Sequence, residues 1–149
     1  MNISIICIGK LKESFWKDAC EEYLKRLSRF AKIEVLELPE SKTDDVDEES
    51  ASILAHLPKS SYVIALDVAG NSLSSEGLAK KIKTLAVDGT SHISFVIGGS
   101  NGYNDSVRKV ADFRLSFSAF TFPHQLMRVV LLEQIYRAYK INAGEKYHK

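Results

Sequence analysis

The sequence has few cysteines, no long apolar run and almost no net charge, and each absence excludes a class of protein. Only Cys7 and Cys20 occur among 149 residues. One lies in an apolar run and the other in a helical pattern, which is typical of reduced, buried thiols in a cytoplasmic protein. No apolar run approaches the roughly 20 residues of a membrane-spanning helix. The start of the chain lacks the basic segment and cleavage site of a signal peptide, so we expect a cytoplasmic protein with no membrane partner.

Several familiar site motifs are also missing. The four histidines (His56, His92, His124 and His148) are scattered and have no cysteine or histidine at ligand spacing, so we expect no metal. The chain has no GxGxxG fingerprint and no Walker-type phosphate loop, which argues against a standard dinucleotide or nucleoside triphosphate site. It also lacks the GxSxG motif that presents a nucleophilic serine.

The balanced total of 20 basic and 19 acidic residues hides a strong segregation of charge. The segment Glu34–Ser50 holds eight acidic residues and one base. In contrast, Gly9–Lys32 holds seven bases against four acids, and Pro123–Lys149 holds five bases against two acids. Such asymmetry can mark a surface for a polyanion, and solvated helix faces would produce the same pattern.

Short apolar, β-rich runs alternate with helical patterns along the whole chain. The expected strands are Asn2–Ile8, Ile33–Leu38, Tyr62–Asp67, Ile93–Ile97 and Phe113–Phe117. The expected helices are one capped by Ser14, one over Val46–Leu57, one capped by Ser74 or Ser75, one over Asp105–Ala111 and one over His124–Ile141, with a turn at Gly70-Asn71. This alternation predicts an α/β fold with a mainly parallel sheet flanked by helices, in a single domain over residues 1–149.

The last expected helix is apolar around most of its circumference. Its apolar residues are Met127, Val129, Val130, Leu131, Leu132, Ile135, Tyr136, Ala138, Tyr139 and Ile141. Because a sheet covers only one side of a helix, we expect a second subunit to cover the rest, in a two-fold dimer. Complete burial within one subunit is the alternative.

Three segments carry residues suited to binding a ligand. Gly98–Gly102 follows an expected strand, at the edge of a parallel sheet where ligands bind, and a tight turn would also explain its glycines. Phe117–His124 alternates small polar residues with aromatic ones, as a pocket for an adenine or a loop anchored in the core would do. Asn142–Lys149 combines an aromatic ring, an imidazole and two ammonium groups, which suits RNA, although a frayed tail is the alternative. Asp67 is a possible hydrogen-bond acceptor or the cap of a turn.

Taken together, these segments resemble the ribosomal RNA large subunit methyltransferase H family, of the SPOUT class. The resemblance runs essentially from end to end of the chain. Its most specific parts are Phe95–Gly102, Leu115–Ser118, Thr121–Gln125, Arg128–Gln134 and Tyr147–Lys149.

This resemblance implies an enzyme that uses S-adenosyl-L-methionine to methylate N3 of a pseudouridine in 23S ribosomal RNA. It also implies that the substrate is the assembled ribosome, that the protein is a homodimer, and that its C-terminal part forms a trefoil knot. The cofactor-binding positions carried over from the family are Leu66, Gly98, Phe117, Ser118, Ala119, Phe120, Thr121 and Phe122.

The expected chemistry assigns roles to the charged and aromatic residues near the C-terminus. The acceptor nitrogen is largely protonated at neutral pH, so it must lose its proton, and His148 is the candidate base. Tyr147 could stack on the nucleobase, and Arg128 could hold developing negative charge. The candidate RNA-binding residues are Arg137, Lys146 and Lys149.

Two other functions remain open at this stage. One is a non-enzymatic RNA-binding or ribosome-assembly module with the same fold, which would not bind S-adenosylmethionine. The other is a flavodoxin-like nucleotide binder that uses Gly98–Gly102.

Overall fold

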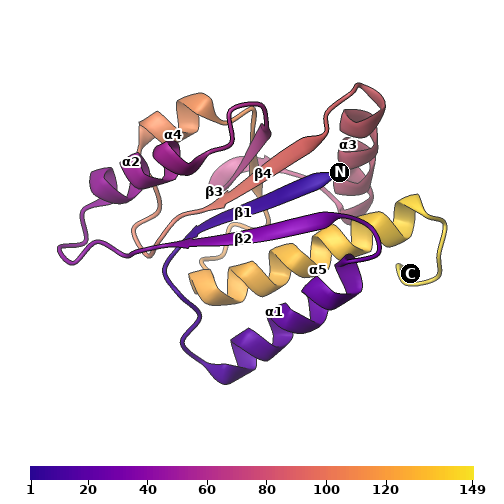
Figure 1. The fold of residues 1–149 in the computed structure, drawn as a ribbon, viewed down its shortest axis with the longest axis horizontal. Helices are drawn as coiled ribbons and strands as arrows, with labels where there is room; N and C mark the ends of the chain where they lie inside the picture. Colours follow the sequence, from indigo (N-terminus) through magenta and orange to yellow (C-terminus); the bar gives the residue numbers. More distant parts are fainter.

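In the computed structural model, which describes residues 1–149, five strands alternate with five helices (Figure 1). The strands are β1 (Asn2–Ile8), β2 (Lys32–Leu38), β3 (Tyr62–Ser72), β4 (His92–Ile97) and β5 (Phe113–Ser116). The helices are α1 (Ser14–Leu27), α2 (Val46–His56), α3 (Ser75–Val87), α4 (Asp105–Val110) and α5 (His124–Asn142). All neighbouring strands are parallel, which confirms the predicted α/β class.

The strand order is β2-β1-β4-β3-β5. A flavodoxin-like sheet has the order 2-1-3-4-5, so this order disfavours the flavodoxin-like alternative. Apolar residues fill both faces of the sheet, with Ile3 and Ile5 packing toward α1, α3 and α5. Ile6 and Ile8 pack on the other face, toward α2 and α4. Figure 1 shows α2 and α4 above the sheet and α1 and α5 below it.

Helix α5 is covered more fully within one chain than its sequence suggested. Both α1 and α3 pack along it, in addition to the sheet, and none of its residues is exposed. The premise that only a sheet could cover this helix was therefore wrong. A dimer through α5 stays a prediction, which needs other support.

Two local predictions were wrong. Gly70-Asn71 is part of β3, because the pairing with β5 shifts register between Leu66 and Asn71 and the strand continues past a bulge. A β-carbon on Gly70 would lie 2.6 Å from the carbonyl oxygen of Arg114, so only glycine fits there. At the start of α1 the cap is Glu13, which makes no side-chain cap bond, and Ser14 is the first helical residue.

Two other local predictions are confirmed, the cap of α3 and the two buried thiols. Ser74 caps α3, with its Oγ accepting a hydrogen bond of 3.0 Å from the amide of Gly77. Cys7 and Cys20 are free and buried, and burial raises the pKa of the Cys7 thiol to about 11.

None of the helices has the length and apolar character needed to cross a membrane. No group of three or more potential metal ligands occurs in the structure.

Candidate active site

A cavity of about 260 Å³ lies where β4 and β5 end and β3 bulges. In a parallel sheet this edge is the usual place for a ligand. Seven of the eight predicted cofactor-binding residues line the cavity, and only Ala119 does not. The seven are Leu66, Gly98, Phe117, Ser118, Phe120, Thr121 and Phe122. The structure thus brings together positions that are up to 56 residues apart in the sequence.

The glycine turn after β4 forms one wall of this cavity. The amide of Gly102 donates a hydrogen bond of 2.9 Å to the carbonyl of Gly99, and Gly102 has a φ of +73°. A β-carbon on Gly98 would lie 2.7 Å from the carbonyl carbon of Gly102. Backbone therefore meets backbone here, and a side chain at Gly98 would force the turn apart.

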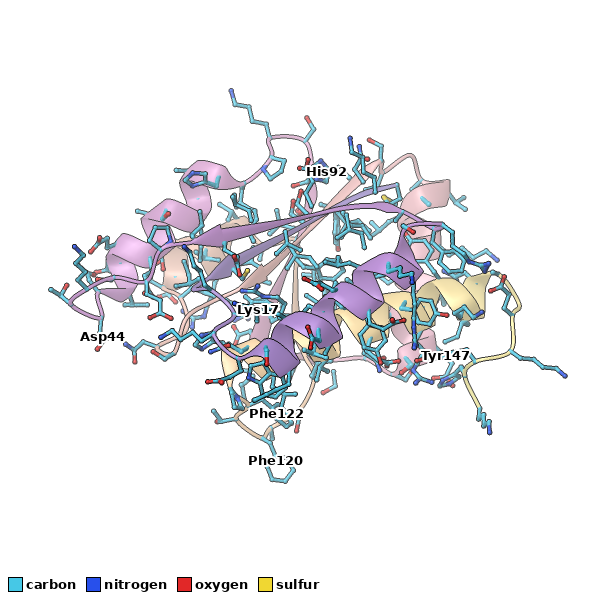
Figure 2. All side chains as sticks on the ribbon, turned by 60° about the horizontal axis from the view of Figure 1, so that its bottom comes forward. Lys17, Asp44, His92, Phe120, Phe122 and Tyr147 are labelled. Carbon is cyan, nitrogen blue, oxygen red and sulfur yellow. The ribbon has the colours of Figure 1, made fainter.

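The loop between β5 and α5 forms the opposite wall. Ser116 Oγ donates a hydrogen bond of 3.0 Å to the carbonyl of Val68, and Ser118 Oγ accepts one of 3.0 Å from the amide of Phe120. Phe117 packs against the core, but Phe120 and Phe122 are exposed, and Figure 2 shows both at the outer end of the loop. Of the three phenylalanines in this segment, only Phe117 anchors it in the core.

One charged cluster borders the cavity. Asp67 Oδ2 accepts hydrogen bonds from Arg108 Nε at 3.3 Å and from Arg114 Nη1 at 3.4 Å, and its Oδ1 accepts one from the amide of Ala69 at 3.0 Å. The hydroxyl of Tyr103 donates a hydrogen bond of 2.8 Å to the carbonyl of Leu66. Burial, followed by the negative charge of Asp67, raises the pKa of Tyr103 well above its usual value. Tyr103 therefore remains a hydrogen-bond donor at neutral pH.

Sequence reasoning missed Arg108 and Tyr103 as cavity residues. Tyr103 lies in the loop after the glycine turn, and α4 is too short for its periodicity to show which way Arg108 faces. Their only signal in the sequence is their position soon after the glycine turn.

Arg128 does not line the cavity. It is 3% exposed, and its Nη1 donates to Glu37 Oε2 at 2.6 Å while its Nη2 donates to the carbonyl of Gly9 at 3.1 Å. Burial alone would raise the pKa of Glu37, but the hydrogen bond and positive charge of Arg128 outweigh that effect and hold it below its usual value. Arg128 thus joins the β1–α1 loop, β2 and α5.

The C-terminal tail is docked on α5 and α3. The hydroxyl of Tyr147 donates a hydrogen bond of 2.9 Å to Glu133 Oε2, and the guanidinium of Arg137 lies 4.7 Å from the centre of the tyrosine ring. His148 lies between Arg137 and Glu76, with its Nδ1 3.1 Å from Arg137 Nη1 and its Nε2 2.7 Å from Glu76 Oε1. Glu133 and Glu76 are therefore further tail partners that the sequence did not indicate.

The cavity lies at the first turn of α5, whereas the tail of the same chain contacts this helix from its middle onward. Met127 of α5 lines the cavity, whereas the tail contacts α5 at Glu133 and Arg137. Ten residues of helix between Met127 and Arg137 span about 15 Å. Figure 2 shows the same separation between Phe120 and Phe122 at one end and Tyr147 at the other. The structure does not bring His148 to the cavity of the same chain. Lys146 and Lys149, which are exposed and flank Tyr147 and His148, do not reach it either.

Comparison with known proteins shows which sequences this chain resembles. A family model described as "Predicted SPOUT methyltransferase" matches residues 1–148. The chain is 55% identical to the "Ribosomal RNA large subunit methyltransferase H" of Clostridium novyi, over the whole of both chains. It is 51% identical to the protein of the same name from Bifidobacterium animalis subsp. lactis, again over the whole of both chains.

A solved structure of a probable methylase family protein from Haemophilus influenzae has the same fold. It matches 99% of this chain and 70% of its own, with a TM-score of 0.59 and 16% sequence identity. At that identity the likeness supports the fold alone.

Proposed function

This chain belongs to the SPOUT methyltransferase family, and we propose that it transfers a methyl group from S-adenosylmethionine to N3 of a pseudouridine in 23S ribosomal RNA. The proposed substrate is the assembled ribosome, in the cytoplasm. The main support is the cavity, because seven of the eight residues carried over as cofactor-binding line it together. The full-length relatives at 51–55% identity are named as ribosomal RNA large subunit methyltransferases, which supports methyl transfer to ribosomal RNA.

The residues of the cavity suit the chemically different parts of this cofactor. Apolar side chains such as Leu115 and Phe117 can bury an adenine, and the hydroxyls of Ser118 and Thr121 can bind ribose or ring atoms. The charged cluster at Asp67 lies beside them. When bound, S-adenosylmethionine supplies a methyl group on a positively charged sulfur atom.

The proton on the acceptor nitrogen is the next requirement. In the proposal His148 takes this proton, because an imidazole nitrogen that carries a lone pair can accept one. Tyr147 cannot serve instead, because burial and then its hydrogen bond to the Glu133 carboxylate raise its pKa to about 12. Its ring suits stacking on the nucleobase, and Arg137, Lys146 and Lys149 suit RNA phosphates or the developing anion.

This assignment requires two subunits. His148 contacts α5 at Arg137, ten residues from Met127 at the cavity, and a two-fold axis across that helix would place one subunit's tail at its partner's cavity. The exposed phenylalanines support such a contact. Phe15 is 58% exposed on the first turn of α1. This turn lies near the first turn of α5, since the amide of Lys12 donates a hydrogen bond to Gln125. Phe120 is 77% exposed in the adjacent loop.

A C-terminal trefoil knot, implied by the family resemblance, is part of the same proposal. A loop held in a knot cannot open without disturbing its neighbours. The cavity would therefore be formed before the cofactor arrives, and binding would cost little ordering entropy.

The decisive experiment is mass mapping of 23S ribosomal RNA from cells that lack this protein. We expect one pseudouridine to lose a methyl group, and the wild-type gene to restore it. His148→Ala should fail to restore it, whereas the control His56→Ala, at the exposed end of α2, should succeed. Ribosomal RNA with an unchanged mass would contradict the proposed function. Purified protein should also methylate intact ribosomes in preference to naked 23S RNA.

A further inference from the structure

Arg108 is the only lysine or arginine that lines the cavity. Its side chain is 36% exposed at the cavity rim. Two of its three guanidinium nitrogens have protein partners: Nε donates to Asp67 at 3.3 Å and Nη1 donates to Asp105 at 3.0 Å. The third nitrogen, Nη2, has no hydrogen-bond partner in the protein. One cationic donor is therefore left available at the cavity.

The position of this guanidinium is fixed from several sides. Asp67 is only 9% exposed, and the amide of Ala69 holds its other oxygen. The carbon centre of the guanidinium lies 5.1 Å from the centre of the Tyr103 ring. The hydroxyl of that tyrosine is bonded in turn to the carbonyl of Leu66, which lines the cavity. Arg108 therefore needs little reorganisation to receive an anion.

A fixed guanidinium with a free N–H edge favours a carboxylate or a phosphate. S-adenosylmethionine carries one carboxylate, at its amino-acid end, and its adenosine part carries no negative charge. We propose, on the basis of the proposed function, that Arg108 binds the α-carboxylate of the cofactor. Asp67 and Tyr103 are then positioning residues, which act on the cofactor through Arg108. An RNA phosphate is the other anion that this guanidinium could bind. Arg108 lines the cavity, however, and this position favours the cofactor.

Calorimetry with two ligands tests this assignment. S-adenosylhomocysteine has the amino-acid end, whereas 5′-methylthioadenosine shares the adenosine and the sulfur but has no carboxylate. We expect Arg108→Gln to bind S-adenosylhomocysteine about tenfold to a hundredfold more weakly, as the loss of a charge-assisted hydrogen bond predicts. Its affinity for 5′-methylthioadenosine should stay the same. Arg108→Lys keeps the charge and should lose less.

Arg114→Gln is the matched control. Arg114 donates to the same oxygen of Asp67 but does not line the cavity, so its removal should leave the affinity for both ligands unchanged. Circular dichroism would establish that each variant is folded. If Arg108→Gln does not fold, the same selective loss, in smaller measure, is expected of Arg108→Lys.

Several results would overturn the assignment. An equal loss of affinity for both ligands would mean that Arg108 only supports the shape of the cavity. Unchanged affinity for both would mean that Arg108 does not bind the cofactor. Weaker binding to ribosomes with normal affinity for S-adenosylhomocysteine would assign Arg108 to an RNA phosphate. If the wild-type protein bound neither ligand, the proposed function itself would fail.

Discussion

Arg128 on α5 donates a hydrogen bond of 2.6 Å from Nη1 to Oε2 of Glu37 on β2, 91 positions earlier in the chain. The arginine is 3% exposed, so its charge is compensated by Glu37 rather than by water. The pair joins the edge of the sheet to the helix that carries the tail contacts.

Glu37→Gln should therefore lower the free energy of unfolding by about 2 kcal/mol, because the variant leaves a buried charge without its partner. The expected loss is below the usual range for a buried pair because the side chain of Glu37 is 33% exposed. Urea denaturation would measure it. The control is Glu22→Gln, which removes an exposed pair with Arg26 and should cost much less, because water screens the two charges. Equal losses in the two variants would contradict this account.

The same pair predicts how stability depends on pH. The pKa of Glu37 lies below its ordinary value of 4.5 in the folded protein, so the unfolded chain takes up the proton first as the pH falls. The contribution of the pair to the free energy of unfolding is complete above pH 4.5. It is lost as the pH falls through the lower pKa that Glu37 has in the folded protein. We expect the melting temperature of Glu37→Gln to fall less steeply than that of the wild type between about pH 5 and pH 3. Parallel curves would show that the pair contributes nothing to acid stability.

Substitutions in the tail should distinguish the role of His148 from that of Tyr147. His148→Ala should lower single-turnover methylation by about a hundredfold to ten-thousandfold, the usual contribution of a general base, with normal affinity for S-adenosylhomocysteine. Tyr147→Phe keeps the ring and loses only the hydrogen bond to Glu133, so we expect less than about a tenfold loss. A His148→Ala variant with lowered thermal stability and unchanged turnover would make the tail a structural element.

Mixed dimers should show which subunit supplies the tail. We expect His148→Ala and Gly98→Ala each to be inactive alone. If the tail acts on the partner's cavity, a mixed dimer contains one intact site. With random pairing of equal amounts, half of the dimers are mixed, so about a quarter of wild-type activity should return. No recovery after subunit exchange, verified by mass spectrometry, would place the tail and cavity in the same subunit.

Gly98→Ala should abolish cofactor binding. Its β-carbon would lie 2.7 Å from backbone atoms of Gly102, so the cavity wall would have to move. Calorimetry with S-adenosylhomocysteine would measure the loss. Gly77→Ala is the control, because Gly77 does not line the cavity and the nearest contact of its β-carbon would be the hydroxyl of Ser74, at 3.3 Å. Normal binding by Gly98→Ala would contradict the importance of this close approach.

The sequence predicted the parts of the fold that depend on local pattern. The strands appeared as short apolar runs and the longer helices as periodic apolar patterns, and the glycine turn after β4 and the loop before α5 were both singled out. The bulge at Gly70 was missed because it depends on the backbone of Arg114, which lies 44 positions later in the sequence. The burial of α5 by α1 and α3 is likewise a property of the assembled layers.

The charged contacts could not be predicted for a related reason. Arg108, Asp67 and Tyr103 lie in three different segments, and only the folded sheet edge brings them together. The same is true of the tail, where residues of α3 and α5 meet His148. Spacing along the chain contains no information about such distant pairs.

The packing of α5 also has a consequence for how the protein is made. Leu131, Leu132 and Ile135 of this helix belong to the same core cluster as Ile3 and Ile5 of β1, which is among the first segments to be synthesised. No two consecutive strands are joined by a hairpin, since every pair is parallel. A nascent chain therefore leaves the ribosome with this face of its sheet covered by α1 and α3 alone until α5 has followed. Folding of that face must wait for the end of translation, and a stalled chain that lacks α5 would expose an aggregation-prone surface.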